Sequence, residues 1–297
     1  MSVTHSIAEE TAPSITRDLI SLTKPRIISL LLVTTVIPMF VAGDPSLLQV
    51  VLVTVGGYLM AGGANAVNMY LDRDIDDRMS RTRLRPIPSG RMGARAVLAF
   101  GVALAAAATW LLGQFINPLT AALALGGFYF YILVYTRWLK RTTPQNIVIG
   151  GAAGAFPPLV GWAAVTGHID LTAVYLFLIV FFWTPPHFWA LALLKQTDYG
   201  RAGVPMAPLV WGERETMDQM LWYTMILIGV TVLPVSFGAF GVTYLLSALV
   251  LGGILAGGIV RVRRATHWAK PAWWVYKYSL LYLALLFVAM VVDRALA

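Results

Sequence analysis

The sequence predicts an all-α, polytopic membrane protein with about nine transmembrane helices around a central cavity that opens to the cytoplasmic side. Of the 297 residues, 58% are hydrophobic and only 12% are charged, which is not the composition of a soluble domain. We expect residues 1–297 to form a single membrane domain. Apolar runs long enough to cross a bilayer recur along the chain, at about 27–43, 47–67, 96–116, 119–135, 145–165, 171–194, 219–240, 242–260 and 273–292.

The start of the chain predicts an interfacial segment. Residues 1–26 are polar, include Glu9 and Glu10, and lack the features of a signal or transit peptide, so the first apolar run is expected to direct insertion. The segment from Ile15 to Lys24 mixes apolar and polar side chains and predicts a short interfacial helix. An anchoring role is favoured over substrate contact, and Pro25 is expected to begin the first span.

The basic residues predict the orientation in the membrane. With a cytoplasmic N-terminus, 21 of the 22 Lys and Arg side chains fall on the cytoplasmic side, and only Arg294 falls on the other. This asymmetry follows the positive-inside rule and places the C-terminus opposite the N-terminus. The net charge of +8 therefore reflects topology, and no nucleic-acid partner is expected. Arg137 and Lys140, in a short basic loop, either bind an anionic group or serve only as topological signals.

The segment between Asn65 and Arg95 is the most chemically distinctive part of the sequence. It holds four of the 14 acidic residues and seven of the 22 basic ones, directly after the second apolar run. If the helix of that run continues, Asn68, Asp72 and Asp76 recur every four residues and share one face. Such a stripe of oxygen ligands, followed by arginines, suits a magnesium-bridged diphosphate. The alternative is a solvated loop of mixed charge at a helix end.

Two other apolar runs carry residues that are unusual within a membrane. The run at 145–165 is rich in Gly and Pro, and irregular backbone at membrane depth is tolerated only when it is buried in protein or beside a cavity. We therefore expect this run to line a cavity, with Asn146 at the cytoplasmic entrance. In the run at 171–194, His187 is an intramembrane ionisable group, which suggests function. A substrate or haem contact and a neutral structural histidine fit the sequence equally well. The chain has no cysteine, which excludes disulfides and thiolate chemistry.

Several motifs carry a family resemblance. They are Asn68-Met-x-x-Asp72-x-x-Ile-Asp76, Asn146-Ile-Val-Ile-Gly150, His187-Phe-Trp-Ala and Asp198-Tyr-x-x-Ala-Gly203-Val-Pro-Met206. With these motifs the chain resembles the UbiA-type intramembrane prenyltransferases, and within them the branch of protohaem IX farnesyltransferases, or haem O synthases. The aspartate-rich motif is typical of the whole superfamily, whereas the last two motifs single out the haem branch.

The resemblance implies roles for individual residues. Magnesium on farnesyl diphosphate would be held by Asn68, Asp72 and Asp76, with Asp198 as a further ligand. Phosphate oxygens would be held by Arg81 and Arg85, and the site would be closed from a second loop by Lys195, Asp198 and Tyr199. Independently of the resemblance, further substrate contacts are expected from Asn146, His187, Arg137 and Lys140. Ala202 stands where the superfamily often has a second aspartate, so a second metal site built fully from carboxylates is not expected.

The resemblance also implies the reaction and its setting. Departure of diphosphate from magnesium-bound farnesyl diphosphate would give an allylic carbocation, which a vinyl group of haem B captures before water completes the addition. His187 and Tyr199 are candidates for managing water or protons. The implied location is the cell inner membrane, with active-site loops in the cytoplasm. The implied partners are the lipid bilayer and a haem A synthase or oxidase assembly factors.

Three other functions stay open on the sequence. An aromatic quinone precursor or a chlorin could replace haem as the prenyl acceptor. A cation-coupled transporter would also carry intramembrane carboxylates and Gly/Pro breaks, although its carboxylates are expected near the midplane. A non-catalytic scaffold leaves the four-residue Asn/Asp register unexplained.

Overall fold

The structure is a computed structural model that describes residues 14–296, so the expectations for the polar start around Glu9 and Glu10 lie outside the described residues. Within this range the chain is helical and contains no strand. The elements are α1 (Ile15–Thr23), α2 (Pro25–Ala42), α3 (Leu47–Leu71), α4 (Arg73–Asp76), α5 (Ala94–Phe115), α6 (Pro118–Tyr129), the π-helix η1 (Phe130–Leu139), α7 (Lys140–Thr142), α8 (Asn146–Gly150), α9 (Ala152–Thr166), α10 (Leu171–Leu194), α11 (Gln196–Arg201), α12 (Ala207–Val210), α13 (Glu213–Ser236), α14 (Val242–Arg264) and α15 (Ala269–Leu296).

Nine helical segments within residues 14–296 are long and apolar enough to cross a membrane, which confirms the predicted number. Most are single helices, but Pro118–Thr142 joins α6, η1 and α7, and Asn146–Thr166 joins α8 and α9. Several helices extend beyond the predicted runs. For example, α13 begins at Glu213 and α14 ends at Arg264, because charged residues at a helix end lower the hydropathy without ending the helix.

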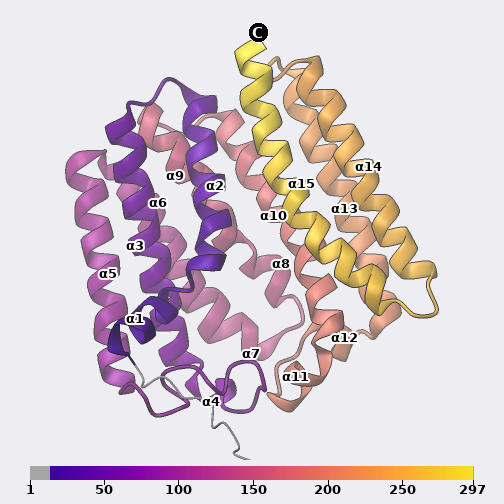
Figure 1. Cartoon of the computed structure of the whole chain (residues 1–297). Helices are drawn as coiled ribbons and strands as arrows, with labels where there is room; N and C mark the ends of the chain where they lie inside the picture. The colour runs from indigo at the N-terminus through magenta and orange to yellow at the C-terminus, as the bar shows by residue number, and fades with distance from the viewer. Residues whose placement is uncertain (1–13, 297) are drawn as a thin grey trace, which may run out of the picture.

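Most of the spanning helices form two groups (Figure 1). On one side lie α2, α3, α5 and α6, and on the other lie α10, α13, α14 and α15. The short helices α1, α4, α11 and α12 gather at one end of the bundle, which we call the polar end, and the C-terminus lies at the opposite end. The loops that carry the predicted site residues therefore meet at one end of the molecule.

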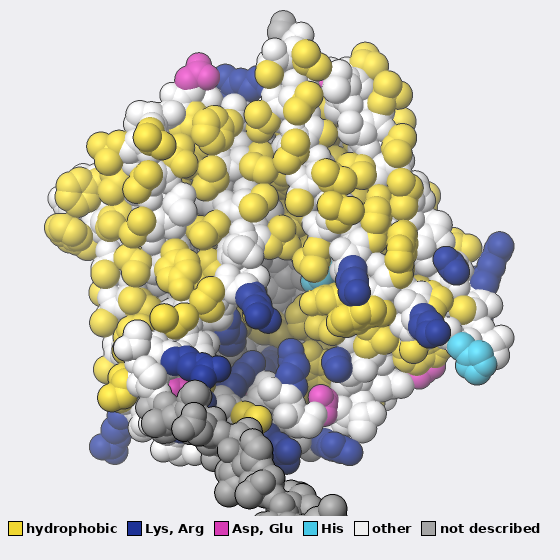
Figure 2. All heavy atoms as spheres, viewed as in Figure 1, with side chains coloured by type: hydrophobic (Ala, Val, Ile, Leu, Met, Phe, Trp, Pro, Cys, Tyr) yellow, Lys and Arg dark blue, Asp and Glu magenta, His cyan; other side chains and the backbone are white. Residues whose placement is uncertain are grey.

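The outer surface is that of a multi-pass membrane protein. Large apolar side chains on the spanning helices are exposed, including Leu47, Trp110, Leu133 and Leu249. Figure 2 shows hydrophobic side chains over much of the visible face and Lys and Arg side chains concentrated toward the polar end. A soluble protein rarely exposes apolar surface on this scale, whereas lipid solvates it.

Glycines let the helices approach closely where they surround the cavity. A Cβ atom on Gly63 of α3 would lie 2.6 Å from the backbone oxygen of Gly101 in α5. A Cβ atom on Gly161 of α9 would lie only 1.8 Å from the backbone oxygen of Thr35 in α2. Small residues are the usual means of close helix packing in lipid, since apolar faces alone gain little from meeting each other there. These contacts fix α3 against α5 and α9 against α2.

The contact between α2 and α9 gives a stability prediction. Gly161→Ala should destabilise the protein by about 1–3 kcal/mol, because the added methyl group forces the two backbones apart. The measurement is thermal unfolding of the purified protein in detergent. Gly229→Ala in α13 is the matched control, because its Cβ atom would meet nothing within 4 Å. Equal melting temperatures for the two variants would contradict the close approach of α2 and α9.

Candidate active site

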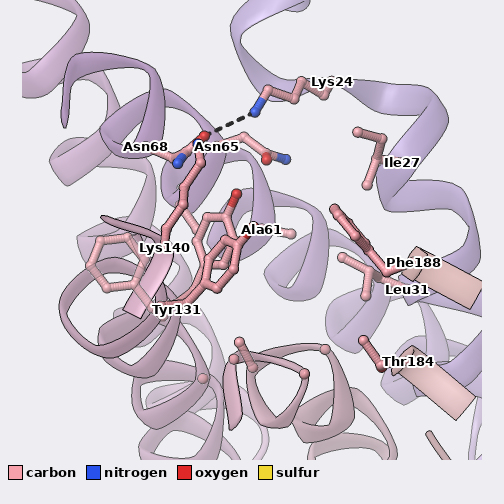
Figure 3. A pocket seen from close by; sticks show the side chains of 18 of the residues that line it. Lys24, Ile27, Leu31, Ala61, Asn65, Asn68, Tyr131, Lys140, Thr184 and Phe188 are labelled. Carbon is pink, nitrogen blue, oxygen red and sulfur yellow. Dashed lines mark hydrogen bonds between the residues drawn. The ribbon is translucent and has the colours of Figure 1, made fainter. Parts of the chain in front are cut away.

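A cavity of about 480 Å³ lies between the spanning helices and reaches the polar end. Its walls come mainly from α2, α3, α6, η1, α8, α9 and α10. Single residues are added by α4, α7, α11 and α15, and the loop after α4 contributes Arg81 and Arg85. Figure 3 shows Lys24, Asn68 and Lys140 grouped at one end of this cavity, with Leu31 and Phe188 farther along the apolar part. The cavity therefore pairs a charged entrance with an apolar interior.

The predicted stripe of Asn68, Asp72 and Asp76 lines the charged end of the cavity. The stripe was predicted on the assumption that the helix continues through it, and the structure shows a break. The helix α3 ends at Leu71, and Asp72 adopts φ −90° and ψ 5°. The four-residue register survives this break. The backbone amide of Asp72 donates to the Asn68 carbonyl at 2.9 Å, and the amide of Asp76 donates to the Asp72 carbonyl at 2.8 Å. All three side chains are buried and remain on the same side of the chain.

Basic side chains from separate segments neutralise the two buried carboxylates. Lys140 Nζ of α7 lies 2.5 Å from Asp72 Oδ2, and Arg85 Nη1 lies 2.6 Å from Asp76 Oδ2. The guanidinium of Arg141 lies 3.7 Å from Asp72 Oδ1. Buried charges are stable only when they are paired in this way. Lys140 and Arg85 were both predicted site residues, and the structure brings them to the same cluster.

Arg141 also connects this cluster to the surface. Its guanidinium donates two hydrogen bonds to Asp74, at 2.7 and 2.8 Å, and a third to the Leu71 carbonyl. The hydrogen bonds from Arg141 lower the pKa of Asp74 to about 2. This contact ties α7 to the end of α3 and was not predicted, because nothing in the sequence indicates which acidic residue the basic loop meets.

Lys24 lines the cavity, although the sequence favoured an anchoring role for its segment over substrate contact. The predicted short helix and the start of the first span at Pro25 are confirmed. Between them Lys24 has φ 55°, a left-handed conformation that turns the chain between α1 and α2. Its Nζ donates to Asn68 Oδ1 at 3.2 Å (Figure 3). Burial, reinforced by the charge of Arg85, lowers the pKa of Lys24 to about 7.

The carboxylates retain free ligand atoms. Asn68 Nδ2 donates to Asp72 Oδ2 at 2.7 Å and to Thr136 Oγ1 at 3.1 Å, so one oxygen of Asp72 is fully engaged. Asp72 Oδ1 and Asp76 Oδ1 are buried and accept no hydrogen bond from the described residues. Buried carboxylate oxygens without a donor are costly unless a cation takes that place. Within residues 14–296 no group of three acidic, His or Cys side chains forms a complete protein-only metal site, so other ligands would complete a hydrated Mg²⁺.

The second predicted loop reaches the cavity through only one of its three residues. Tyr199 is buried and lines the cavity, and burial raises the pKa of its hydroxyl against the opposing charge of Arg81. Lys195 is exposed and does not line the cavity. Asp198 Oδ1 accepts a hydrogen bond from Ser80 Oγ at 2.8 Å, which links the two polar loops outside the cavity lining. In this structure Asp198 therefore connects two loops and does not line the cavity.

The fifth span lines the cavity as predicted, and its helix is interrupted at Gly151 between α8 and α9. Asn146 at its start is fully buried but is not part of the cavity lining. Its amide nitrogen donates to the carbonyls of Thr143 and Pro205, at 2.6 and 3.3 Å. Asn146 therefore joins the loops around the entrance. Arg137 is exposed and lies outside the cavity lining.

A ten-residue π-helix, η1, adds two tyrosines that sequence reasoning missed. The rings of Tyr131 and Tyr135 stack with centroids 5.6 Å apart, and both line the cavity. Gly150 makes room for this pair, because a Cβ atom there would lie 2.3 Å from Tyr135 Cδ2. In the sequence these tyrosines look like ordinary membrane aromatics. Single-turn π-bulges are often found at functional sites, and a π-helix of this length is rare.

His187 of α10 also lines the cavity. The cavity thus brings together side chains from segments far apart in the sequence. They are the aspartate stripe, Arg81, Arg85, Lys140, His187 and Tyr199. The combination of an apolar cavity and a charged end with free carboxylate oxygens suits an amphipathic substrate with an anionic head group.

Comparisons with known proteins agree with this architecture. A sequence profile described as the UbiA prenyltransferase family matches residues 30–292. The chain is 55% identical to "Protoheme IX farnesyltransferase" of Roseiflexus sp. (strain RS-1) over 98% of its own length and 55% of that protein. It is 51% identical to the protein of the same name from Symbiobacterium thermophilum over 94% of each chain. The chain therefore spans about half the length of the first relative and nearly all of the second.

A solved structure shares the fold. It is a UbiA homologue from Archaeoglobus fulgidus bound to DMAPP and Mg²⁺, which superimposes with a TM-score of 0.64 at 14% sequence identity, covering 91% of this chain and 99% of that one. At this identity the likeness concerns the fold alone. The profile match and the close relatives are what assign the chain to a family. The protein belongs to the UbiA prenyltransferase family.

Proposed function

We propose that this protein transfers the farnesyl group of farnesyl diphosphate to a vinyl group of haem B, with addition of water, giving haem O and diphosphate. The observation that carries the proposal is the pair of buried carboxylates, Asp72 and Asp76, whose free oxygens lie among basic side chains at the end of an apolar cavity. The acceptor and the donor are proposed because the relatives at 55% and 51% identity carry the name protoheme IX farnesyltransferase.

The charged end of the cavity suits the diphosphate and its metal ion. We assign Mg²⁺ to Asp72 and Asp76, with Asn68 as a third ligand once its amide oxygen leaves Lys24. When bound, Mg²⁺ would neutralise charge on the departing diphosphate. Arg81, Arg85, Lys140 and Lys24 line the cavity, and we assign them to the phosphate oxygens. Charge-assisted contacts of this kind are the strong ones.

The apolar part of the cavity suits the prenyl chain and the reactive cation. The bond between farnesyl C1 and the diphosphate oxygen breaks, and the resulting allylic cation forms a new carbon–carbon bond with the terminal carbon of a haem vinyl group. Water then adds to the inner vinyl carbon and loses one proton, so that a hydroxyethylfarnesyl group remains. Tyr131 and Tyr135 present aromatic surface beside this space, and an electron-rich ring stabilises a nearby cation. We expect the apolar walls to keep bulk water from quenching the cation.

The proposal includes a cellular setting. We propose that the polar end faces the cytoplasm and that the protein lies in the inner membrane, with one membrane domain carrying the whole site. The concentration of Lys and Arg at the polar end supports this orientation through the positive-inside rule. A haem A synthase or oxidase assembly factors would receive the product.

The identity of the acceptor is tested by competition between substrates. Membranes containing the protein are incubated with labelled farnesyl diphosphate and Mg²⁺, with either haem B or 4-hydroxybenzoate. The label should enter only the haem fraction, and magnesium-dependent diphosphate release should match product formation. Labelling of the aromatic acid alone would refute the haem assignment. Binding of cation without diphosphate release would instead favour a transporter.

The role of Asp72 gives a second prediction. Asp72→Asn keeps the size of the side chain but removes a negative charge and a metal ligand, so diphosphate release should fall by about 10²–10³-fold or more. The matched control is Asp77→Asn, an exposed residue five positions later in the same segment, which should retain activity. Both variants should elute as folded protein in detergent. Near-normal turnover by Asp72→Asn would contradict the metal assignment.

A further inference from the structure

The imidazole of His187 is held between two aromatic rings. Trp183, one turn earlier on α10, stacks on one face with centroids 4.3 Å apart and planes at 15°. Tyr276 of α15 stacks on the ring at a centroid distance of 4.9 Å and an angle of 23°. Trp183 is itself fixed, because its Nε1 donates to the Ser279 carbonyl at 2.7 Å. The interface between α10 and α15 therefore sets the plane of the imidazole.

The hydrogen bonds around Ser279 determine which nitrogen of His187 carries the proton. Ser279 Oγ donates its single proton to the Tyr276 carbonyl at 2.8 Å, and it lies 2.7 Å from His187 Nδ1. In this arrangement the hydroxyl accepts from the imidazole, which favours the tautomer with the proton on Nδ1. In a neutral imidazole, Nε2 then carries a free lone pair. Ser279 is completely buried, so water does not replace it in this role.

The Nε2 edge is the part of the ring that remains available. The two stacking neighbours and Ser279 engage the rest of the imidazole, and within residues 14–296 the structure records no hydrogen bond to Nε2. His187 and Tyr276 both line the cavity. The other two histidines in the described part of the chain, His168 and His267, are exposed and do not line it. The cavity therefore has one oriented imidazole with a basic nitrogen.

We propose that His187 Nε2 is the axial ligand of the iron of the haem acceptor, and that Ser279 is the positioning residue that keeps this nitrogen deprotonated. This inference rests on the proposed function. A neutral imidazole is a common protein ligand of haem iron, and a hydrogen bond from its other nitrogen typically fixes its orientation and raises its basicity. Haem is thereby held by the α10 and α15 wall, while the diphosphate is held by α3, the loop after α4 and α7. Because iron occupies its lone pair, His187 is not the base that removes the proton from water.

The test uses the full chain in nanodiscs, titrated with haem B and with metal-free protoporphyrin IX. The wild-type protein should bind haem B at least about tenfold more tightly, because only haem offers iron to a ligand. Reduced haem should give the iron–histidine stretching band in resonance Raman spectra. His187→Ala should lose the band and the preference for haem, and added imidazole should restore the band. His168→Ala is the matched control and should behave as wild type.

Three results separate the possible failures. Equal affinity of the wild-type protein for the two porphyrins, or a retained iron–histidine band in His187→Ala, overturns the axial ligand while leaving farnesyl transfer to haem intact. A wild-type protein that binds no haem and prenylates an aromatic acid overturns both the ligand and the proposed function. Ser279→Ala should keep haem bound but shift the frequency of the iron–histidine band, because Nδ1 loses its hydrogen-bond acceptor. An unchanged frequency overturns the positioning role of Ser279.

Discussion

Two carboxylates without solvent contact impose the main constraint on this molecule. Asp72 and Asp76 are fully buried, so cations within the protein must balance their charge. The cations come from other segments, Lys140 on α7 and Arg85 in the loop after α4. The fourth span must therefore meet the end of α3 in one register. Because apolar helix faces in lipid discriminate little between partners, these charged contacts supply specificity that hydrophobicity alone cannot.

Departures from regular helix concentrate where this charged cluster meets the cavity. The chain breaks its helix at Asp72, reverses through a left-handed Lys24, widens into the π-helix η1 and interrupts the fifth span at Gly151. Each departure frees or redirects backbone groups, which a membrane tolerates only beside protein or a cavity. At these positions the chain directs polar side chains and two tyrosines toward a common space. The regular helices elsewhere hold these irregular segments in place.

Local patterns in the sequence were enough to predict the spans and the aspartate stripe. The nine crossings follow from run length and composition, and the register of Asn68, Asp72 and Asp76 follows from helix periodicity. Contacts between distant segments could not be predicted in the same way. Nothing local shows that Lys24 reaches Asn68 across 44 residues, or that Asp198 meets Ser80 outside the cavity. The roles predicted for Lys195, Asp198, Arg137 and Asn146 stay predictions. None of these four side chains lines the cavity.

The central claim is that the free oxygens of Asp72 and Asp76 bind a divalent ion that carries the diphosphate. The most direct measurement is a structure of the full chain with Mn²⁺ in place of Mg²⁺ and a non-reactive thio analogue of farnesyl diphosphate, with the metal located by anomalous scattering. The account predicts a metal peak in contact with both carboxylates, and the diphosphate between that metal and the Arg85 and Lys140 side chains. A metal peak away from both aspartates, or a diphosphate bound at the other end of the bundle, would contradict it.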